Sequence, residues 1–129
     1  MSDLDNVMEW VAYAEEDFLV AKSALRRKKP LIISSCFHSQ QCAEKYFKAM
    51  LISKDMEFPK THDLVILDGL CSQAGIITGF ANEDLGRLSA YAVHTRYPGA
   101  QAVPEEGDEA LEISGSIRKF ARTFLGIGR

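Results

Sequence analysis

Hydrophobic residues along this chain recur at alternating steps of three and four, the spacing typical of amphipathic helices. In the first predicted helix, residues 3–27, the stripe consists of Val7, Val11, Ala14, Phe18, Ala21 and Leu25. In the second, residues 31–54, it consists of Ile33, Cys36, Gln40, Ala43, Phe47 and Met50. Lys28-Lys29-Pro30 separates the two stripes, and a proline suits the first turn of the helix that follows.

Three further helices are predicted from capping and stop signals. A third covers residues 62–73 with Thr61 as its N-cap, a fourth lies near residues 83–95 with Asn82 as its N-cap, and a fifth covers residues 105–125. No segment shows sustained alternation with period two, so no sheet is expected. The sequence therefore predicts an all-α fold, an up-and-down bundle of about five helices, in a single domain spanning residues 1–129.

The composition narrows the class of protein. Apolar residues make up 47% and charged residues 26%, which predicts an ordinary globular domain. The net charge of −3 lacks the basic excess of a dedicated nucleic-acid binder, so any contact with RNA must come from a local site. The one basic run, Arg26-Arg27-Lys28-Lys29, is interpreted as a solvated helix end.

The cysteines and the hydropathy indicate the cellular compartment, and the histidines indicate whether a metal site is expected. Three cysteines without a CxxC pair predict reduced thiols in a cytoplasmic protein. With no apolar run near 18 residues and no signal-peptide pattern, neither a membrane span nor secretion is expected. His38, His62 and His94 share no metal-ligand spacing, so we expect no metal and no cofactor.

The second predicted helix contains polar residues where apolar ones are expected. Gln40 and Glu44 fall inside its apolar arc, and Gln41 and Lys48 lie at the edge. An ionised carboxylate inside that arc is costly unless it is paired. One interpretation is an exposed pair of Glu44 and Lys48 one turn apart. The other is a polar network that reaches another helix or a second subunit.

Two further elements can complete such a network. His62 and Asp63 open the third predicted helix, where a carboxylate is favourable and a histidine can orient a carboxylate or contact a phosphate. Arg96-Tyr97-Pro98 closes the fourth, and a guanidinium there suits either the last carbonyls, a buried carboxylate or a phosphate. The hypothesis is one site that binds a nucleotide phosphate through its cations. The candidate ligand-binding or polar-network residues are Gln41, Glu44, Lys48, His62, Asp63, Arg96 and Tyr97.

The same elements carry a family resemblance. Residues 40–49 read Gln-Gln-Cys-Ala-Glu-Lys-Tyr-Phe-Lys-Ala, residues 61–64 read Thr-His-Asp-Leu, and Arg96-Tyr97-Pro98 follows; residues 14–18, Ala-Glu-Glu-Asp-Phe, precede them. In this order, over about residues 10–120, the chain resembles the HEPN family, a nucleotide-binding domain of higher eukaryotes and prokaryotes. The resemblance implies a helical bundle that usually dimerises and often stands beside a small nucleotidyltransferase.

Some such pairs are toxin and antitoxin, and the resemblance then implies a metal-independent ribonuclease with an Arg, four to six residues and a His. No histidine follows Arg96, and the formal match is Arg87 with His94, although apolar Leu88 follows the arginine. We therefore expect a non-catalytic homodimeric binding module that partners a nucleotidyltransferase, binds a nucleotide, or both. The alternatives are a ribonuclease toxin using Arg87 and His94, and a purely structural interaction subunit.

The homodimer is predicted from aromatic surface on the first helix. Trp10 and Tyr13 lie beside its apolar stripe, and we expect them to form the interface.

Overall fold

The computed structural model describes residues 3–92 and 102–128. Its elements are α1 (Asp3–Arg26), α2 (Ile32–Ser53), α3 (Leu64–Gln73), α4 (Asn82–Ser89), the 3-10 turn η1 (Ala90–Ala92) and α5 (Pro104–Phe124). Within these ranges there is no strand. The predicted all-α bundle of about five helices is confirmed.

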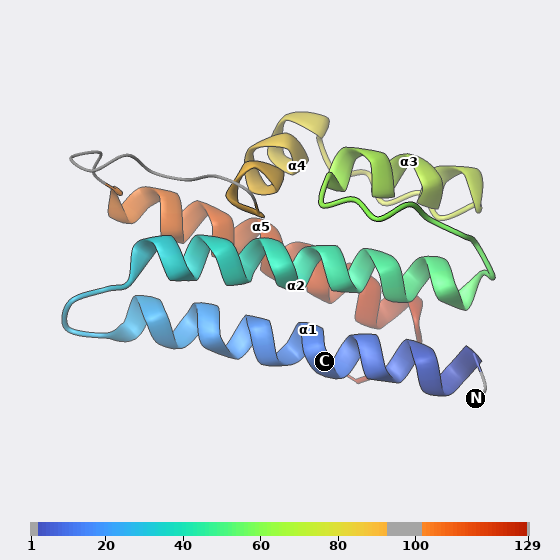
Figure 1. The fold of residues 1–129 in the computed structure, drawn as a ribbon, viewed down its shortest axis with the longest axis horizontal. Helices are drawn as coiled ribbons and strands as arrows, with labels where there is room; N and C mark the ends of the chain where they lie inside the picture. The colour runs from blue at the N-terminus through green and yellow to red at the C-terminus, as the bar shows by residue number, and fades with distance from the viewer. Residues whose placement is uncertain (1–2, 93–101, 129) are drawn as a thin grey trace.

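The second helix is the centre of the bundle. α1 and α2 lie side by side and antiparallel, and α5 packs against both of them (Figure 1). α3 and α4 contact α2 from another side, and η1 also contacts it. α5 runs in the same direction as α2, because α3, α4 and their connections come between them in the chain (Figure 1). α2 is therefore covered along most of its length, and a buried polar group on it needs a hydrogen-bond partner.

The core follows from this arrangement. The fully buried side chains of α2 include Tyr46, Phe47, Met50 and Leu51. Facing them are buried side chains of α1, α3, α4 and α5, namely Val7, Val11, Ala14, Leu64, Leu67, Leu85, Leu88, Ala110, Ile117 and Ala121. Each large apolar side chain among these contributes about 1.5–3 kcal/mol by leaving water. The stripes read from the sequence are the surfaces that meet, except at Ile33, which is 53% exposed although it was assigned to the stripe of the second helix.

Two predicted N-caps are wrong by one or two residues. α3 begins at Leu64, and its N-cap is Asp63, whose Oδ1 accepts a hydrogen bond from the amide of Val65 at 2.9 Å. Thr61 Oγ1 instead accepts from the amide of Asp63 at 3.1 Å, so Thr61 stabilises the turn before the helix. Asn82 is the first residue of α4 rather than its N-cap, because Ala81 occupies the cap position.

The predicted fourth helix is also too long. α4 ends at Ser89, where the Ser89 hydroxyl donates to the Leu85 carbonyl at 2.7 Å and accepts from the Leu64 amide at 2.8 Å. The second of these bonds ties the end of α4 to the start of α3. The predicted end of that helix at Arg96-Tyr97-Pro98 lies outside the described residues.

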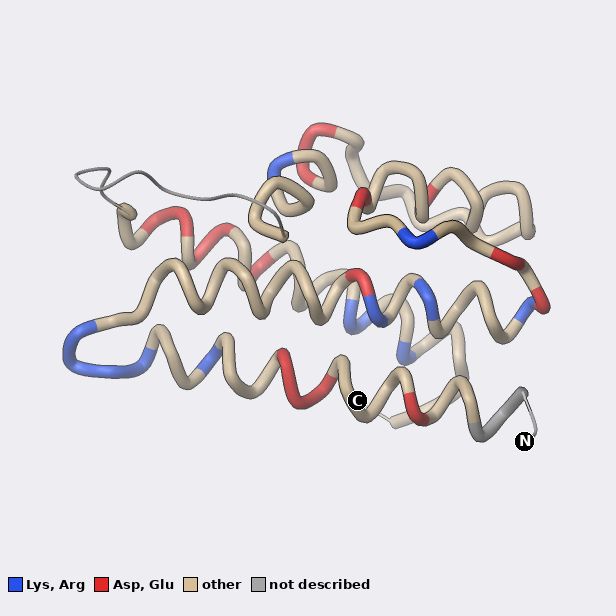
Figure 2. Tube along the Cα trace, viewed as in Figure 1, with Lys and Arg blue, Asp and Glu red and all other residues tan. Residues whose placement is uncertain are grey.

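The surface charges agree with a solvated connection between the first two helices. Lys and Arg gather at the turn from α1 to α2 (Figure 2), and all four residues of the basic run 26–29 are exposed. The three cysteine side chains, in contrast, are buried. None of the helices in the described ranges has the length and apolar content needed to cross a membrane.

Candidate functional site

A buried carboxylate on α2 is the centre of the first polar cluster. Glu44 is only 4% exposed. Its Oε2 accepts a hydrogen bond from Lys48 Nζ at 2.8 Å, and its Oε1 lies 2.8 Å from His62 Nδ1. Gln40 Nε2 donates to the same Oε1 at 3.2 Å. We call Gln40, Gln41, Glu44, Lys48 and His62 the Glu44 centre.

Lys48 closes one side of this centre. Its side chain is buried, and Nζ lies 5.6 Å from the ring centroids of both Trp10 and Phe58. The two rings meet edge to face, with centroids 6.4 Å apart. The ammonium group is thus stabilised by a carboxylate and by two aromatic faces in place of water. The interpretation of Glu44 and Lys48 as an exposed pair is wrong, because neighbouring elements cover both side chains.

The two glutamines bind this carboxylate to the segment before α3. Gln40 Nε2 also donates to the backbone carbonyl of His62 at 3.0 Å, and Gln41 Nε2 donates to Gln40 Oε1 at 2.7 Å. The His62 side chain is 57% exposed. The centre is therefore closed at Lys48 and open to solvent at His62.

The protonation of Glu44 follows from these contacts. Burial alone raises the pKa of this carboxyl, but hydrogen bonds from Lys48, His62 and Gln40, together with the Lys48 charge, hold it below its ordinary value. The group is therefore ionised at neutral pH. It serves as a fixed negative charge rather than as a proton donor.

A pocket adjoins the open side of the Glu44 centre. It has a volume of about 470 Å³ and lies between the start of α3 and α4. Its lining residues are His62, Asp63, Val65, Gly86, Ser89 and Ala90. Because the Glu44 carboxylate engages His62 Nδ1, Nε2 is the ring nitrogen that remains for a ligand.

The predicted candidate residues divide into three groups. Glu44, Lys48 and His62 are in direct contact, and Gln41 joins them through Gln40. Asp63 caps α3 and lines the pocket beside His62. Arg96, Tyr97 and His94 lie outside the described residues, so their place relative to the centre stays a prediction.

Arg87, the arginine of the formal ribonuclease match, has a structural role on the surface. Its Nε donates to Glu109 on α5 at 2.9 Å, and Nη2 donates to Asp84 on its own helix. The side chain is half-exposed at 50%. The guanidinium thus joins α4 to α5.

A second carboxylate cluster was not among the sequence predictions. Glu15 on α1 accepts two hydrogen bonds from Arg118 on α5, at 2.6 and 2.7 Å, and one from the hydroxyl of Tyr46 at 2.5 Å. Arg122 Nη1 donates to the same hydroxyl at 3.0 Å. We call Glu15, Tyr46, Arg118 and Arg122 the Glu15 centre. It joins α1, α2 and α5.

The Glu15 centre also shifts the acidity of its members. Burial raises the pKa of Glu15, but the hydrogen bonds from Arg118 and Tyr46 outweigh it and the net pKa is lowered. Burial and the neighbouring Glu15 carboxylate raise the pKa of Tyr46, so its hydroxyl keeps its proton. Signals for this centre in the sequence are sparse, since Glu15 and Arg118 are 103 positions apart.

Asp17, beside Glu15, also pairs across α1 and α2. It is 8% exposed, and its carboxylate lies 2.7 Å from His38 Nδ1 and 2.5 Å from Lys45 Nζ. Asp17 stands three residues after Ala14 and four before Ala21, which is the spacing of the apolar stripe. A carboxylate at that spacing was the available signal for a buried ion pair.

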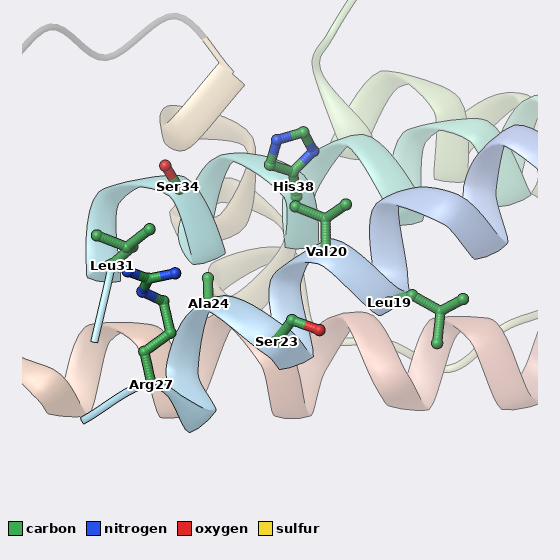
Figure 3. A pocket seen from close by; sticks show the side chains of 8 residues that line it. All are labelled: Leu19, Val20, Ser23, Ala24, Arg27, Leu31, Ser34 and His38. Carbon is green, nitrogen blue, oxygen red and sulfur yellow. The ribbon is translucent and has the colours of Figure 1, made fainter. Parts of the chain in front are cut away.

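A groove runs over α1 and the start of α2 (Figure 3). It has a volume of about 430 Å³ and is lined by Leu19, Val20, Ser23, Ala24, Arg27, Leu31, Ser34 and His38. Three of these apolar side chains are exposed: Leu19 at 62%, Leu31 at 47% and Val20 at 39%. Large apolar residues exposed together are typical of an interface.

Within the described ranges, no group of three or more His, Cys, Asp or Glu side chains is placed to hold a metal ion. Comparisons with curated proteins and with solved structures find no match to this chain. The model of the HEPN domain, in contrast, matches residues 7–124, which is nearly the whole sequence. That range contains both carboxylate centres, and the chain belongs to the HEPN domain family.

Proposed function

We propose that this chain is a non-catalytic HEPN binding module that binds a nucleotide beside His62. The observation that carries the proposal is the geometry of His62, whose Nδ1 is fixed by a buried carboxylate while its ring is 57% exposed in a pocket. A histidine oriented in this way presents Nε2 to a ligand at no further cost in side-chain entropy.

The contacts also define how a nucleotide fits. Lys48 is buried and engaged by Glu44, so it serves the fold and does not reach a phosphate. His62 is then the phosphate contact among the described residues of this pocket, as an imidazolium whose Nδ1 donates to Glu44 and whose Nε2 donates to the phosphate. The Asp63 carboxylate supplies a polar partner for a ribose, and the pocket of about 470 Å³ lies in the range of small-molecule sites.

Calorimetric titration of the full chain with AMP, ADP and ATP tests this proposal. We expect saturable binding that His62→Ala weakens at least about tenfold, the effect of losing one charge-assisted contact. His38→Ala is the matched control, because His38 pairs with Asp17 on α1 and lines the groove rather than this pocket. Absence of binding at millimolar nucleotide would leave His62 with a purely structural role.

The proposed module acts as a homodimer that meets a small nucleotidyltransferase. The groove of Leu19, Val20 and Leu31 supports an assembly surface, and Tyr13 on the same helix is 53% exposed. Trp10, the other aromatic residue of the predicted interface, packs instead on Phe58 and Lys48. The assembly surface on α1 therefore extends from Tyr13 towards the groove.

Light scattering at tens of micromolar tests the assembly. We expect twice the monomer mass, since a stable dimer buries at least about 1,000 Å². Leu19→Glu reduces the mass to that of a monomer, whereas Ile77→Glu, at a residue 72% exposed and outside the groove, leaves the dimer intact. A monomer mass for the unmodified chain contradicts this part of the proposal.

A further inference from the structure

The charges of α5 are divided along its length. Acidic residues occupy its first half, at positions 105, 106, 108, 109 and 112, and basic residues its second half, at positions 118, 119 and 122 (Figure 2). A pocket of about 330 Å³ lies at the basic half. Its lining residues are Gly115, Arg118, Lys119, Arg122, Thr123 and Ile127.

The two guanidinium groups of this pocket are held in place from behind. Arg118 is bound by both oxygens of Glu15, and its guanidinium carbon lies 4.9 Å from the centroid of the Phe18 ring. Arg122 donates to the Tyr46 hydroxyl and to the carbonyl of Gly128. Because both side chains are already ordered, a ligand that they bind loses little affinity to side-chain ordering.

Hydrogen-bond donors of the same residues remain unused. Within the described ranges, Nη1 of Arg118 and Nη2 of Arg122 make no hydrogen bond, and the exposed Lys119 makes neither a hydrogen bond nor an ion pair. Thr123 adds a hydroxyl to the lining. Among the described residues, several donors and no acidic side chain line this pocket, which suits an oxyanion. Guanidinium groups also match the geometry of phosphate.

The charge balance also favours an anion. Of the residues that the structure describes, Arg118, Lys119 and Arg122 contribute three positive charges and Glu15, which contacts both arginines, one negative charge, so these four sum to +2. The C-terminal end of α5 contributes about half a negative charge. That contribution reduces the positive charge of the pocket but does not cancel it.

We propose that this pocket binds the phosphate group of a small phosphorylated molecule. It is distinct from the pocket at His62, because Tyr46 faces it from α2 while Glu44, two positions earlier, points to the opposite side of the helix. Its volume of about 330 Å³ accommodates a phosphate and a group of sugar size. The inference goes beyond the proposed function and does not depend on it.

Amide chemical shifts of the full chain, labelled with nitrogen-15, test this site during titration with inorganic phosphate, AMP and adenosine. We expect phosphate and AMP to shift the amides of Gly115, Thr123 and Ile127 saturably, and adenosine to leave them unchanged. Shifts of the Gly86 and Ser89 amides report binding in the His62 pocket. The absence of binding at one pocket is therefore distinguished from its absence at the other. No saturable shift of Gly115 and Thr123 by about 10 mM phosphate would overturn the proposal.

Lys119→Glu sharpens the test because this side chain is exposed and makes no contact that the fold needs. We expect it to weaken phosphate binding at the pocket about tenfold, through loss of one cation and gain of one anion. Lys60→Glu is the matched control, since Lys60 is also exposed and lies in the segment before α3. Equal effects of the two substitutions would show that only the net charge matters, and the assigned pocket would be wrong.

Discussion

The Glu44 and Glu15 centres both stabilise an ionised glutamate inside the bundle, and they do so with different residues. Each holds an ionised glutamate in the bundle, but the Glu44 side chain is 5% exposed and that of Glu15 is 29% exposed. The deeper one has a lysine, enclosed by aromatic rings, and a histidine; the shallower one has two arginines and a tyrosine. The comparison indicates that enclosure, more than the number of hydrogen bonds, decides how much each carboxylate matters for stability.

The largest expected effect is that of Glu44→Ala. The substitution leaves the buried Lys48 ammonium without its carboxylate, which costs about 3–5 kcal/mol of unfolding free energy. Denaturant unfolding measures this loss, and Glu16→Ala, at an exposed position of α1, is the matched control. Adding Lys48→Met to Glu44→Ala is expected to restore part of the loss. A loss of unfolding free energy below about 0.5 kcal/mol would contradict this prediction, because an exposed ion pair one helical turn apart contributes no more than that.

Tyr46→Phe tests the other centre. It removes the hydroxyl that donates to Glu15 and accepts from Arg122, while the fully buried ring is kept. We expect a loss of about 1–2 kcal/mol, because both partners retain other contacts or solvent access. A double-mutant cycle with Glu15→Gln measures how much of that loss belongs to the pair. A loss as large as that of Glu44→Ala contradicts the ranking of the two centres.

Acid is expected to weaken both centres. The folded-state pKa values of Glu44 and Glu15 are lowered, so the stability that each carboxylate contributes is complete above the unfolded pKa of about 4.3. It is lost as the pH falls through the folded-state pKa. Unfolding free energies measured from pH 7 to pH 3 should decrease, and Glu44→Gln should flatten that decrease. An unchanged slope in this variant would show that Glu44 binds its proton equally in both states.

The smallest effect is expected for Arg87→Ala. Arg87 is half-exposed, and so are the two carboxylates that it contacts, Asp84 and Glu109. We expect the melting temperature to stay within the error of the measurement. Purified protein, with or without the substitution, is expected to leave total RNA intact. Cleavage by the unmodified chain that disappears in Arg87→Ala would instead favour the ribonuclease alternative.

Helical periodicity predicted most of the fold, because each long stripe is read from neighbours three and four positions apart. The same periodicity located the Glu44 centre, since Gln40, Glu44 and Lys48 lie at steps of four on one helix. The Glu15 centre was missed because its partners come from α1, α2 and α5, and no local pattern records which helices will pack. The start of α3 was misplaced because Thr61 and Asp63 are both good caps, and the choice depends on which one faces the amide of Val65.

Trp10 is the single tryptophan of the chain, and the Lys48 ammonium lies over its ring. Its indole is therefore an intrinsic fluorescent reporter of the Glu44 centre, with no other indole to obscure it. Protonation of the Glu44 carboxylate removes the negative charge that Lys48 binds. The fluorescence emission of Trp10 responds to this change in the local electric field. Rapid mixing can then follow the centre in the unlabelled protein in real time.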